Sequence, residues 1–443
     1  MEPLKPFYSP TAPLSYECGR PAHLSRRRLL SCLGAAGLAW MTPLSRLLAE
    51  KALSDKSGRP PKSVILLWLA GGASQLETFD PQEDSSIAYG TRSMGTSVEG
   101  VRLAAGMERT AAVMEHVSLI RSMTSREGDH ERAIYNIKTG YRPEPAIVHP
   151  SIGAVLTHEL NDPSLDIPQH ISILPNEWPA RGGYLGAHLD AFQMGDPAKP
   201  SSDVVGRVST KRMDRRLRGL ERVESTFAKG RSTDSLRGWG VKGQMMDGAL
   251  RMMRSDQLKA FDLSQATRSE RDSLGETAFG RGCLVAARLI EAGVRCVEVT
   301  LKGWDSHVNN HEIQASRVAT LDPAFAGLIN YLKERELLDQ TLVLCGTEFG
   351  RTPQLNPLEG RDHWPKGFSI ALAGGGVVGG QVIGETDPTG ESEEPADPVR
   401  VEDVHATVQQ ALGIDYEKVI ETPVGRPIAL SKGRVIRRLI GES

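Results

Sequence analysis

Cysteine is scarce in this chain, and the spacing of the few cysteines argues against two common structural devices. Of five cysteines among 443 residues, Cys18 and Cys32 lie close to the N-terminus, and no two cysteines have CxxC spacing. Cys283, Cys296 and Cys345 fall within apolar helix and strand patterns. An odd number of scattered thiols does not suit a disulfide framework, and the missing paired spacing argues against a zinc knuckle. We expect these three cysteines to be buried core thiols.

The chain also lacks a strong charge imbalance and a long apolar run. Its 53 Lys and Arg nearly balance 55 Asp and Glu, which leaves a net charge of -2. Such a balance does not suggest a nucleic-acid groove or a polybasic membrane patch, so we expect no nucleic-acid partner. The apolar stretch LLSCLGAAGLAWM near the N-terminus is shorter than the about 20 residues that span a bilayer. We therefore expect no transmembrane span in the mature chain.

A basic run stands directly before that apolar stretch. Ser25 is followed by Arg26, Arg27 and Arg28, and the chain then becomes apolar. A twin-arginine pair before a short, weakly hydrophobic segment is typical of a Tat export signal. We assign residues 1–52 to this signal and its leader, with cleavage near Ala49, and we expect a periplasmic or otherwise extracytoplasmic protein. The alternative is an ordinary amphipathic helix.

The patterns after the leader predict an α/β domain over residues 60–440. An unbroken apolar run at 64–70, bounded by proline and glycine, indicates a strand buried on both faces. Further strands are expected at 117–123, from 171, at 294–300, at 341–347 and from 369, with helices between several of them. Residues 202–275 are charged and rich in helical patterns, so we interpret them as a helical insertion, with core-facing methionines and a solvated basic face at 211–218.

Acidic and imidazole side chains follow three of these elements in the last third of the chain. Asp305 and His307 come after one predicted strand, Glu348 follows the next, and Asp362 with His363 lie in the loop GRDHWP. Carboxyl ends of parallel strands meet at one edge of a sheet, where such proteins bind ligands. Carboxylates beside imidazoles suit a divalent metal, and these ligand types leave Zn, Mn, Ca and Mg open.

Simpler interpretations of the same residues exist. Asp305 or Ser306 is also suited to cap the next helix, which would leave His307 solvated. Glu348 has Arg351 three residues later as a partner for an ion pair without chemistry. Three polar groups at successive strand ends seldom arise from capping alone, which favours the metal site.

A second group of polar residues is expected at the start of a helix over residues 130–139. Asp129 and His130 stand at its N-terminus, where backbone amides and the helix dipole favour an anion. Arg126 and Arg132 are close enough in sequence to hold a phosphate or sulfate there. Thr124 and Ser125, at the end of the preceding strand, are candidate hydroxyl nucleophiles.

The ordered motifs resemble one family. GGASQLETFDP, DHERAIYNIKTGYRP, GWDSH, TEFGRTP, GRDHWP and EDVHATVQQALGID, behind a twin-arginine signal, are similar to DUF1501 proteins over about residues 63–430. That resemblance implies the alkaline phosphatase and sulfatase superfamily. It implies a mixed, mainly parallel sheet sandwiched by helices, with one or two metal ions at the strand ends.

The resemblance also implies site residues and an activity. Glu77 or Asp80 would join Asp305, His307, Glu348, Asp362 and His363 as metal ligands, and Glu77 stands where the family usually has Asp. His130 matches the position of the sulfatase nucleophile, where it would act as phosphoryl acceptor, metal ligand or anion binder. The implied protein is a metal-dependent hydrolase of a sulfate or phosphate ester, with an anionic small molecule or polysaccharide as substrate. The alternative is a non-catalytic envelope module that binds an anionic glycan or a partner.

Overall fold

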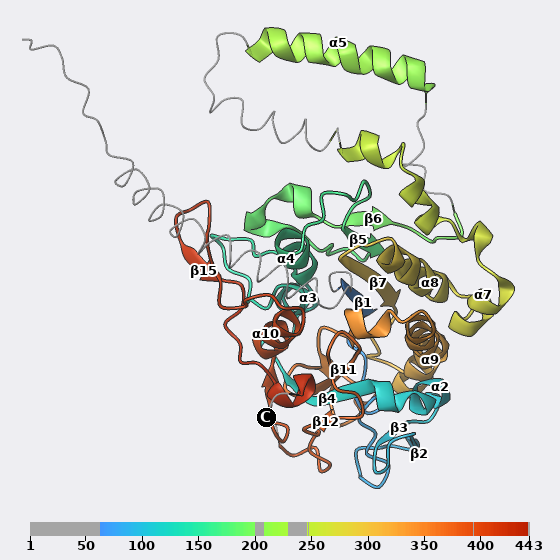
Figure 1. Cartoon of the computed structure of the whole chain (residues 1–443). Coiled ribbons are helices and arrows are strands. Elements are labelled where there is room, and N and C mark those ends of the chain that lie inside the picture. Colours follow the sequence, from blue (N-terminus) through green and yellow to red (C-terminus); the bar gives the residue numbers. More distant parts are fainter. Residues whose placement is uncertain (1–62, 200–207, 229–245, 247, 393, 442–443) are drawn as a thin grey trace, which may run out of the picture. The chain divides into compact units, whose positions relative to one another are not determined.

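The protein is described by a computed structural model that covers residues 63–199, 208–228, 246, 248–392 and 394–441. The predicted signal and its leader, residues 1–52, lie outside the described residues. Figure 1 shows helices on both sides of a central sheet. The strands are β1 Ser63–Ala70, β2 Ser93–Gly95, β3 Arg102–Ala104, β4 Val117–Thr124, β5 His170–Ile173, β6 Phe192–Met194, β7 Cys296–Lys302, β8 Thr341–Gly346, β9 Gly350–Arg351, β10 His363–Trp364, β11 Phe368–Ala373, β12 Val382–Ile383, β13 Val399–Arg400, β14 Val419–Glu421 and β15 Pro427–Ala429.

Nine strands form one mixed sheet in the order β12-β4-β11-β8-β1-β7-β5-β6, with β13 also paired to β4. Every pairing in it is parallel except those of β11, which runs antiparallel to both β4 and β8. The predicted α/β class, with a mixed and mainly parallel sheet, is confirmed. The six predicted strands correspond to β1, β4, β5, β7, β8 and β11, and all six belong to this sheet.

Strand β1 is central because both of its faces are apolar. Ile65, Leu67 and Leu69 belong to one buried cluster, while Val64 belongs to another. The first cluster includes residues of α8 (Ala278–Glu291) and α9 (Asn310–Glu334), and the second includes residues of α4 (Ile152–Glu159) and α10 (Val401–Ala411). Alternate side chains of β1 therefore pack against different helical layers. Because both faces are covered, the sequence of β1 is apolar without interruption. Further α-helices in the part of the chain that the structure describes are α2 Glu108–Ala112, α3 His130–Thr139, α5 Thr210–Ala228 and α7 Arg268–Leu274.

The described parts of the predicted insertion are mainly helical. They include α5, α7 and a 3-10 segment at Asp256–Phe261. Met252 is buried in the first apolar cluster, whereas Lys211, Arg215 and Arg216 are exposed. The basic-face interpretation agrees with these positions, whereas the methionine interpretation holds for Met252 but not for Met246, which is exposed. Among the described residues, none of the helices combines the length and the apolar character that a bilayer crossing requires.

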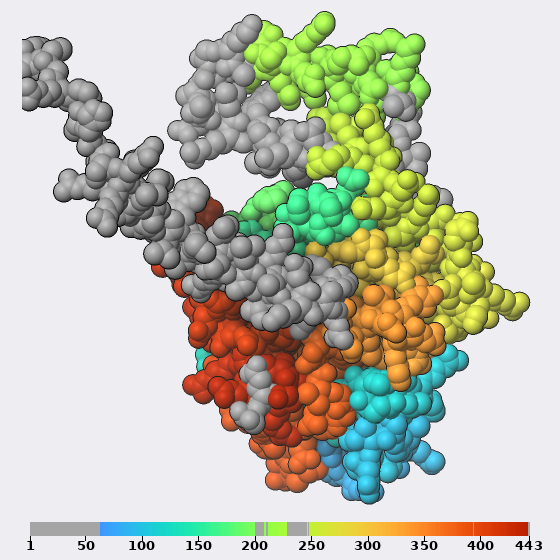
Figure 2. All heavy atoms as spheres, viewed as in Figure 1, coloured from blue at the N-terminus to red at the C-terminus, as the bar shows by residue number. Residues whose placement is uncertain are grey.

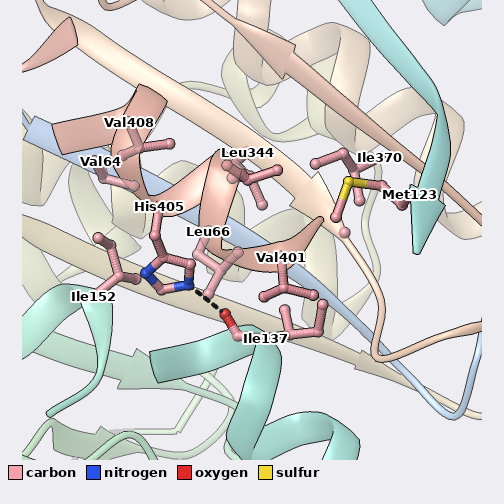
Figure 3. Close-up of a pocket in the computed structure, with 12 residues that line it drawn as sticks. Val64, Leu66, Met123, Ile137, Ile152, Leu344, Ile370, Val401, His405 and Val408 are labelled. Carbon is pink, nitrogen blue, oxygen red and sulfur yellow. Dashed lines mark hydrogen bonds between the residues drawn. The ribbon is translucent and has the colours of Figure 1, made fainter. Parts of the chain in front are cut away.

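A small apolar cavity lies between the sheet and α10 (Figure 3). Its volume is about 40 Å³, and Val64 and Leu344 from the sheet face Val408 and His405 from α10. The only polar ring in it, that of His405, bonds through Nε2 to the carbonyl oxygen of Ile137 in α3 at 2.7 Å. Burial lowers the pKa of His405 to about 4. A cavity with such an apolar lining is expected to stay dry.

The C-terminal segment is part of the same packed body. Val404 and Val408 of α10 share an apolar cluster with Leu372 of β11. In Figure 2 the red C-terminal segment and the orange segment before it form one continuous surface. Cys283, Cys296 and Cys345 are buried and free, as predicted.

Candidate metal centre

The candidate site lies where several strands end at the same edge of the sheet. Strands β7 and β8 are parallel to β1, and β4 has the same direction because β11 runs antiparallel to both β4 and β8. The loops after β7 and β8 carry Asp305 and Glu348, and the loop after β4 leads to His130 at the start of α3. Residues more than 200 positions apart in the chain therefore meet at this edge.

Three imidazoles gather around one carboxylate, and we call His130, His307, His363 and Asp305 the imidazole–aspartate cluster. The distances to the Asp305 carboxylate are 3.6 Å from His130 Nε2, 3.2 Å from His307 Nε2 and 3.5 Å from His363 Nε2. The Nε2 atoms of His307 and His363 are 3.1 Å apart. Three of these residues, His130, Asp305 and His363, place one ligand atom each within 4.8 Å of one another.

The other ring nitrogen of each imidazole is held from outside the cluster. Each Nδ1 faces an oxygen that accepts a hydrogen bond, so a neutral ring keeps its proton on Nδ1 and turns the Nε2 lone pair inward. Such outer partners fix both tautomer and orientation in metal sites. The pairs are His130 with Glu348 at 2.9 Å, His307 with Asp362 at 2.7 Å and His363 with the carbonyl oxygen of Gly128 at 2.8 Å.

Asp305 is held in place by a buried guanidinium. Arg351 Nη2 donates to Asp305 Oδ1 at 2.6 Å, and its Nε donates to the carbonyl oxygen of Gly72 at 2.8 Å. Although burial opposes it, bonding to His130, His363 and Arg351 holds the pKa of Asp305 well below its usual range. The carboxylate is therefore ionised and ready to bind a cation.

Close backbone packing at the end of β1 requires glycine. Gly71 has a φ of +120°, and a Cβ atom added there would stand 2.6 Å from the backbone nitrogen of Asp305. The Gly71 amide in turn donates to Glu348 Oε1 at 2.8 Å. The first strand thus contributes backbone to the centre.

Glu348 is fully buried and supports His130 from behind. Its carboxylate accepts hydrogen bonds from the His130 imidazole, from the Gly71 amide and, at 3.2 Å, from the Thr347 hydroxyl. The facing carboxylate of Asp305, and after it that of Glu348, raises the pKa of His130 to about 9. Without a cation, His130 is therefore protonated at neutral pH.

Both simpler interpretations of these residues fail. Arg351 pairs with Asp305 rather than with Glu348. The N-cap of α9 is Asn309, so Asp305 does not cap that helix. Ser306 is buried, and its hydroxyl donates to Asn310 Oδ1 at 2.7 Å.

The structure does not bring Glu77 or Asp80 to the imidazole–aspartate cluster. Glu77 Oε1 accepts from Arg361 Nη2 at 3.1 Å and from Thr91, with His311 Nε2 at 3.5 Å. Asp80 accepts from the Thr386 amide at 2.8 Å and lies 3.5 Å from Arg121, and burial raises its pKa. Both acids are therefore committed to other partners.

The two predicted anion-binding arginines do not contact the cluster. Arg132 donates to Glu127 at 2.7 Å, and Arg126 is exposed on a neighbouring cleft. The two candidate hydroxyls are bonded elsewhere too. Thr124 donates to the carbonyl oxygen of Val399 at 3.3 Å, and Ser125 donates to Asn136 Oδ1 at 3.2 Å.

Three contributions were missed by the sequence analysis. Arg351 supports Asp305, Arg361 neutralises Glu77, and the Gly128 carbonyl orients His363. A signal for the two arginines existed, because each stands in a motif beside site residues. A backbone carbonyl leaves no signal in the side-chain sequence.

The donor set fits a divalent ion. In a tetrahedral site with metal–nitrogen bonds of 2.0–2.1 Å, neighbouring ligand atoms are about 3.3 Å apart. The contacts of 3.2 and 3.5 Å from His307 and His363 to Asp305 Oδ1, and of 3.1 Å between the two rings, lie close to that spacing. His130 Nε2 is 3.6 Å from the other oxygen, Oδ2. His307 and Asp305 have 45% of their side-chain surface exposed, which leaves the centre open to a ligand.

Comparison with known proteins gives one family and several distant likenesses. A family model described as "Protein of unknown function (DUF1501)" matches residues 61–440. No curated protein matches the sequence of this chain. Among solved structures, the chain is similar to the PsFucS1 sulfatase from Pseudoalteromonas sp., with 12% identity, coverage of 82% of this chain and 70% of that one, and a TM-score of 0.38.

Two further structures show the same degree of likeness. For a 2-O GAG sulfatase the identity is 9%, the coverage is 87% of this chain and 75% of that one, and the TM-score is 0.42. For the alkaline phosphatase from the Antarctic bacterium TAB5 the identity is 12%, the coverage is 81% and 99%, and the TM-score is 0.37. At these scores, any chemistry must be argued from the residues of this chain.

Proposed function

The chain belongs to the DUF1501 family, and from that premise we propose that it is an exported, metal-dependent hydrolase of a sulfate or phosphate ester. The observation that carries the proposal is the convergence of three Nε2 atoms on Asp305, with every Nδ1 oriented by a partner. A capped or solvated histidine needs no such outer support. Oriented imidazoles around an ionised carboxylate are an arrangement that binds a cation.

Zn or Mn suits this centre better than Ca or Mg. Imidazole nitrogen is a borderline ligand that favours transition metals, whereas Ca and Mg prefer oxygen. Glu348 and Asp362 then act from outside, because their oxygens bond to Nδ1 atoms of the ligating rings. When bound, a divalent ion supplies Lewis-acid polarisation of the ester oxygen.

The chain's own residues prepare the centre for an anionic ester. Arg351 keeps Asp305 ionised and oriented, and the exposed side of the cluster admits the substrate. His130 is the residue whose role decides the mechanism. Without a cation its pKa of about 9 keeps it protonated. In the loaded centre a neutral His130 would be a ligand, and a protonated one would be placed to donate a proton to the leaving alcohol.

The role of His130 is open to direct test with His130→Gln. As a ligand, its loss should lower the affinity for Zn, whereas as an acid its loss should lower kcat with the metal content unchanged. Either outcome keeps the hydrolase proposal. Unchanged metal content together with unchanged kcat would remove His130 from the site.

A second candidate function is a non-catalytic module that binds an anionic glycan or an envelope partner. The observation in its favour is that the hydroxyls of Thr124 and Ser125 are bonded away from the cluster. Hydrolysis here would then need water or the His130 imidazole as the nucleophile. A screen for turnover separates the two candidates.

The test combines metal analysis with turnover. The purified full chain, loaded with Zn or with Mn, is analysed for metal and assayed on 4-nitrophenyl phosphate and 4-nitrophenyl sulfate. We expect one stoichiometric ion and an activity that Asp305→Ala abolishes, while Asp272→Asn on exposed α7 changes neither. If the protein binds no stoichiometric ion, the proposal is wrong. If it binds an ion but hydrolyses neither ester, the non-catalytic binding module is favoured.

Export is the remaining part of the proposal, and it is supported by the Arg26–Arg27 pair before an apolar stretch. Replacing both arginines with lysine should retain the protein in the cytoplasm of its host, whereas the unchanged chain should reach the periplasm. If the variant and the unchanged chain were distributed equally between cytoplasm and periplasm, the Tat assignment would be wrong. The proposal for the metal centre would not be affected.

A further inference from the structure

A basic cleft lies beside the metal centre at the same edge of the sheet. Its volume is about 940 Å³, near the upper end of the range of ligand sites and far more than one sulfate or phosphate needs. Five cationic side chains and two carboxylates line it, although the whole chain has a net charge of -2. The cations are Arg126, Arg142, Lys366, Arg400 and Lys432, and the carboxylates are Glu394 and Glu402.

Part of this positive charge is not neutralised within the protein. Arg142 donates to Glu127 at 2.6 Å, and Arg400 lies 3.3 Å from Glu402. Arg126 and Lys432 are both exposed, and neither forms an ion pair with any other residue that the structure describes. Lys432 instead stands over the ring of Tyr141, with Nζ 5.5 Å from its centroid.

Helix α10 adds to this field. Its first turn, at Arg400, Val401 and Glu402, forms part of the cleft wall, so the positive end of the helix dipole faces the cleft. Glu402 and Asp403 in the same turn offset part of that effect. The surplus of positive charge therefore rests mainly on Arg126 and Lys432.

The cleft and the metal centre share two loops. His363 belongs to the imidazole–aspartate cluster, while Pro365, two residues later, lines the cleft. Two residues span at most about 7 Å of chain. The loop after β4 also reaches both sites, because Ser125 lines the cleft and His130 belongs to the cluster. The two loops are joined by a hydrogen bond of 2.7 Å from the Ser125 amide to the Pro365 carbonyl oxygen.

We propose that the cleft binds a second anionic group of the substrate, so that the substrate is an anionic oligosaccharide with charges on neighbouring sugar units. The assignment of the first ester to the metal centre rests on the proposed function, whereas binding in the cleft does not. An anion in the cleft meets Arg126 and Lys432 without displacing any internal carboxylate. The chain as a whole has no excess of basic residues, which disfavours nucleic acid as the ligand.

Binding measured by calorimetry tests this assignment independently of turnover. The Zn-loaded full chain is titrated with a sulfated hexasaccharide, with the desulfated hexasaccharide and with inorganic sulfate. The double variant Arg126→Gln, Lys432→Gln should bind the sulfated hexasaccharide at least about tenfold more weakly, because two charge-assisted contacts are lost. Its Zn content should equal that of the unchanged protein.

The matched control is Arg102→Gln, which removes an exposed cation next to Glu83 that does not line the cleft. It should leave the affinity for the sulfated hexasaccharide unchanged. For the unchanged protein, raising the salt concentration should weaken binding, and the double variant should show a smaller dependence on salt.

Several outcomes would overturn the inference. Equal affinity of the double variant and the unchanged protein would remove the cleft as the site, and equal affinity for the desulfated sugar would remove charge recognition. Tighter binding of a single-stranded oligonucleotide would overturn the assignment to a glycan. If metal and turnover are absent but the cleft binds the sulfated hexasaccharide, the proposed function fails while the cleft assignment stands.

Discussion

Two histidines contact the same helix, α3, and their pKa values shift in opposite directions. His130 begins the helix and faces the carboxylates of Asp305 and Glu348, which raise its pKa to about 9. His405 touches the helix from the apolar cavity, through the carbonyl oxygen of Ile137, and burial lowers its pKa to about 4. The charge of an imidazole is thus decided by its neighbours and not by the helix that it contacts.

The two regions also differ in how their polar atoms are satisfied. In the metal centre, each polar group has several partners, and Asp305 alone contacts three imidazoles and Arg351. In the cavity of Figure 3, a single hydrogen bond from His405 stands among aliphatic side chains. The first region is built to hold charge, and the second is built to exclude it.

The largest effect is expected from breaking the charged region at its centre. Asp305→Ala removes the carboxylate on which the imidazoles converge, so bound Zn should fall below stoichiometry and hydrolysis should fall by at least about a thousandfold. Metal analysis and initial rates measure both. An Asp305→Ala protein that keeps its ion and its rate would show that the cluster is not the active centre.

The second prediction concerns the uncharged region. The folded-state pKa of His405 is below the unfolded value, so the unfolded chain binds the extra proton between pH 6.5 and pH 4. The neutral, buried His405 therefore contributes up to about 3 kcal/mol to the free energy of unfolding. This contribution is fully present above pH 6.5 and is lost as the pH falls toward 4.

Urea unfolding at pH 7, 5.5 and 4 measures this effect as a difference between proteins. On acidification, His405→Leu should lose less free energy of unfolding than the unchanged chain. The control His158→Gln, at an exposed position, should lose as much as the unchanged chain. Parallel losses in His405→Leu and the unchanged chain would contradict the assignment of a neutral, buried His405.

A smaller effect is expected from loosening the support of one ligand. Asp362→Ala removes the acceptor of His307 Nδ1, which lies 2.7 Å away, while leaving all four members of the cluster in place. Loss of such an outer partner lowers metal affinity by about 10- to 100-fold. Competition with a Zn chelator measures it, and an affinity equal to that of the unchanged protein would remove Asp362 from the centre.

The smallest effect concerns the helix that joins the two regions. Asp129 caps α3, because its side chain accepts from the Arg132 amide. Asp129→Ala should cost about 1 kcal/mol of unfolding free energy. Asp129→Asn, which keeps an acceptor, should cost less, and equal losses in the two variants would show that the cap does not depend on the acceptor.

Much of the fold was predictable because it depends on local patterns. The apolar run of β1 and the helical spacing of α3, with Asp129 before it and Gly140 after it, indicated both elements and their ends. The antiparallel direction of β11 was not predictable, because SIALA has the same apolar character as a parallel strand. Direction is set by the path of the connecting chain.

The sequence predicted which residues belong to the candidate site better than it predicted which partners they bond to. Asp305, His307 and His363 were expected at the strand ends and meet there. Glu77 was expected with them, yet its carboxylate is held by Arg361, 284 positions away in the chain. A contact at that separation depends on how two loops fold against each other.

The amino-acid sequence by itself determined the strands, the helices and the position of acids and imidazoles at strand ends, because burial and backbone preference act over a few residues. Only the tertiary structure decided that Arg351 binds Asp305, that Glu348 orients His130 and that uncompensated cations gather beside them. Hydrogen bonds and ion pairs form between groups a few ångströms apart, and that proximity is created when distant segments pack around one sheet.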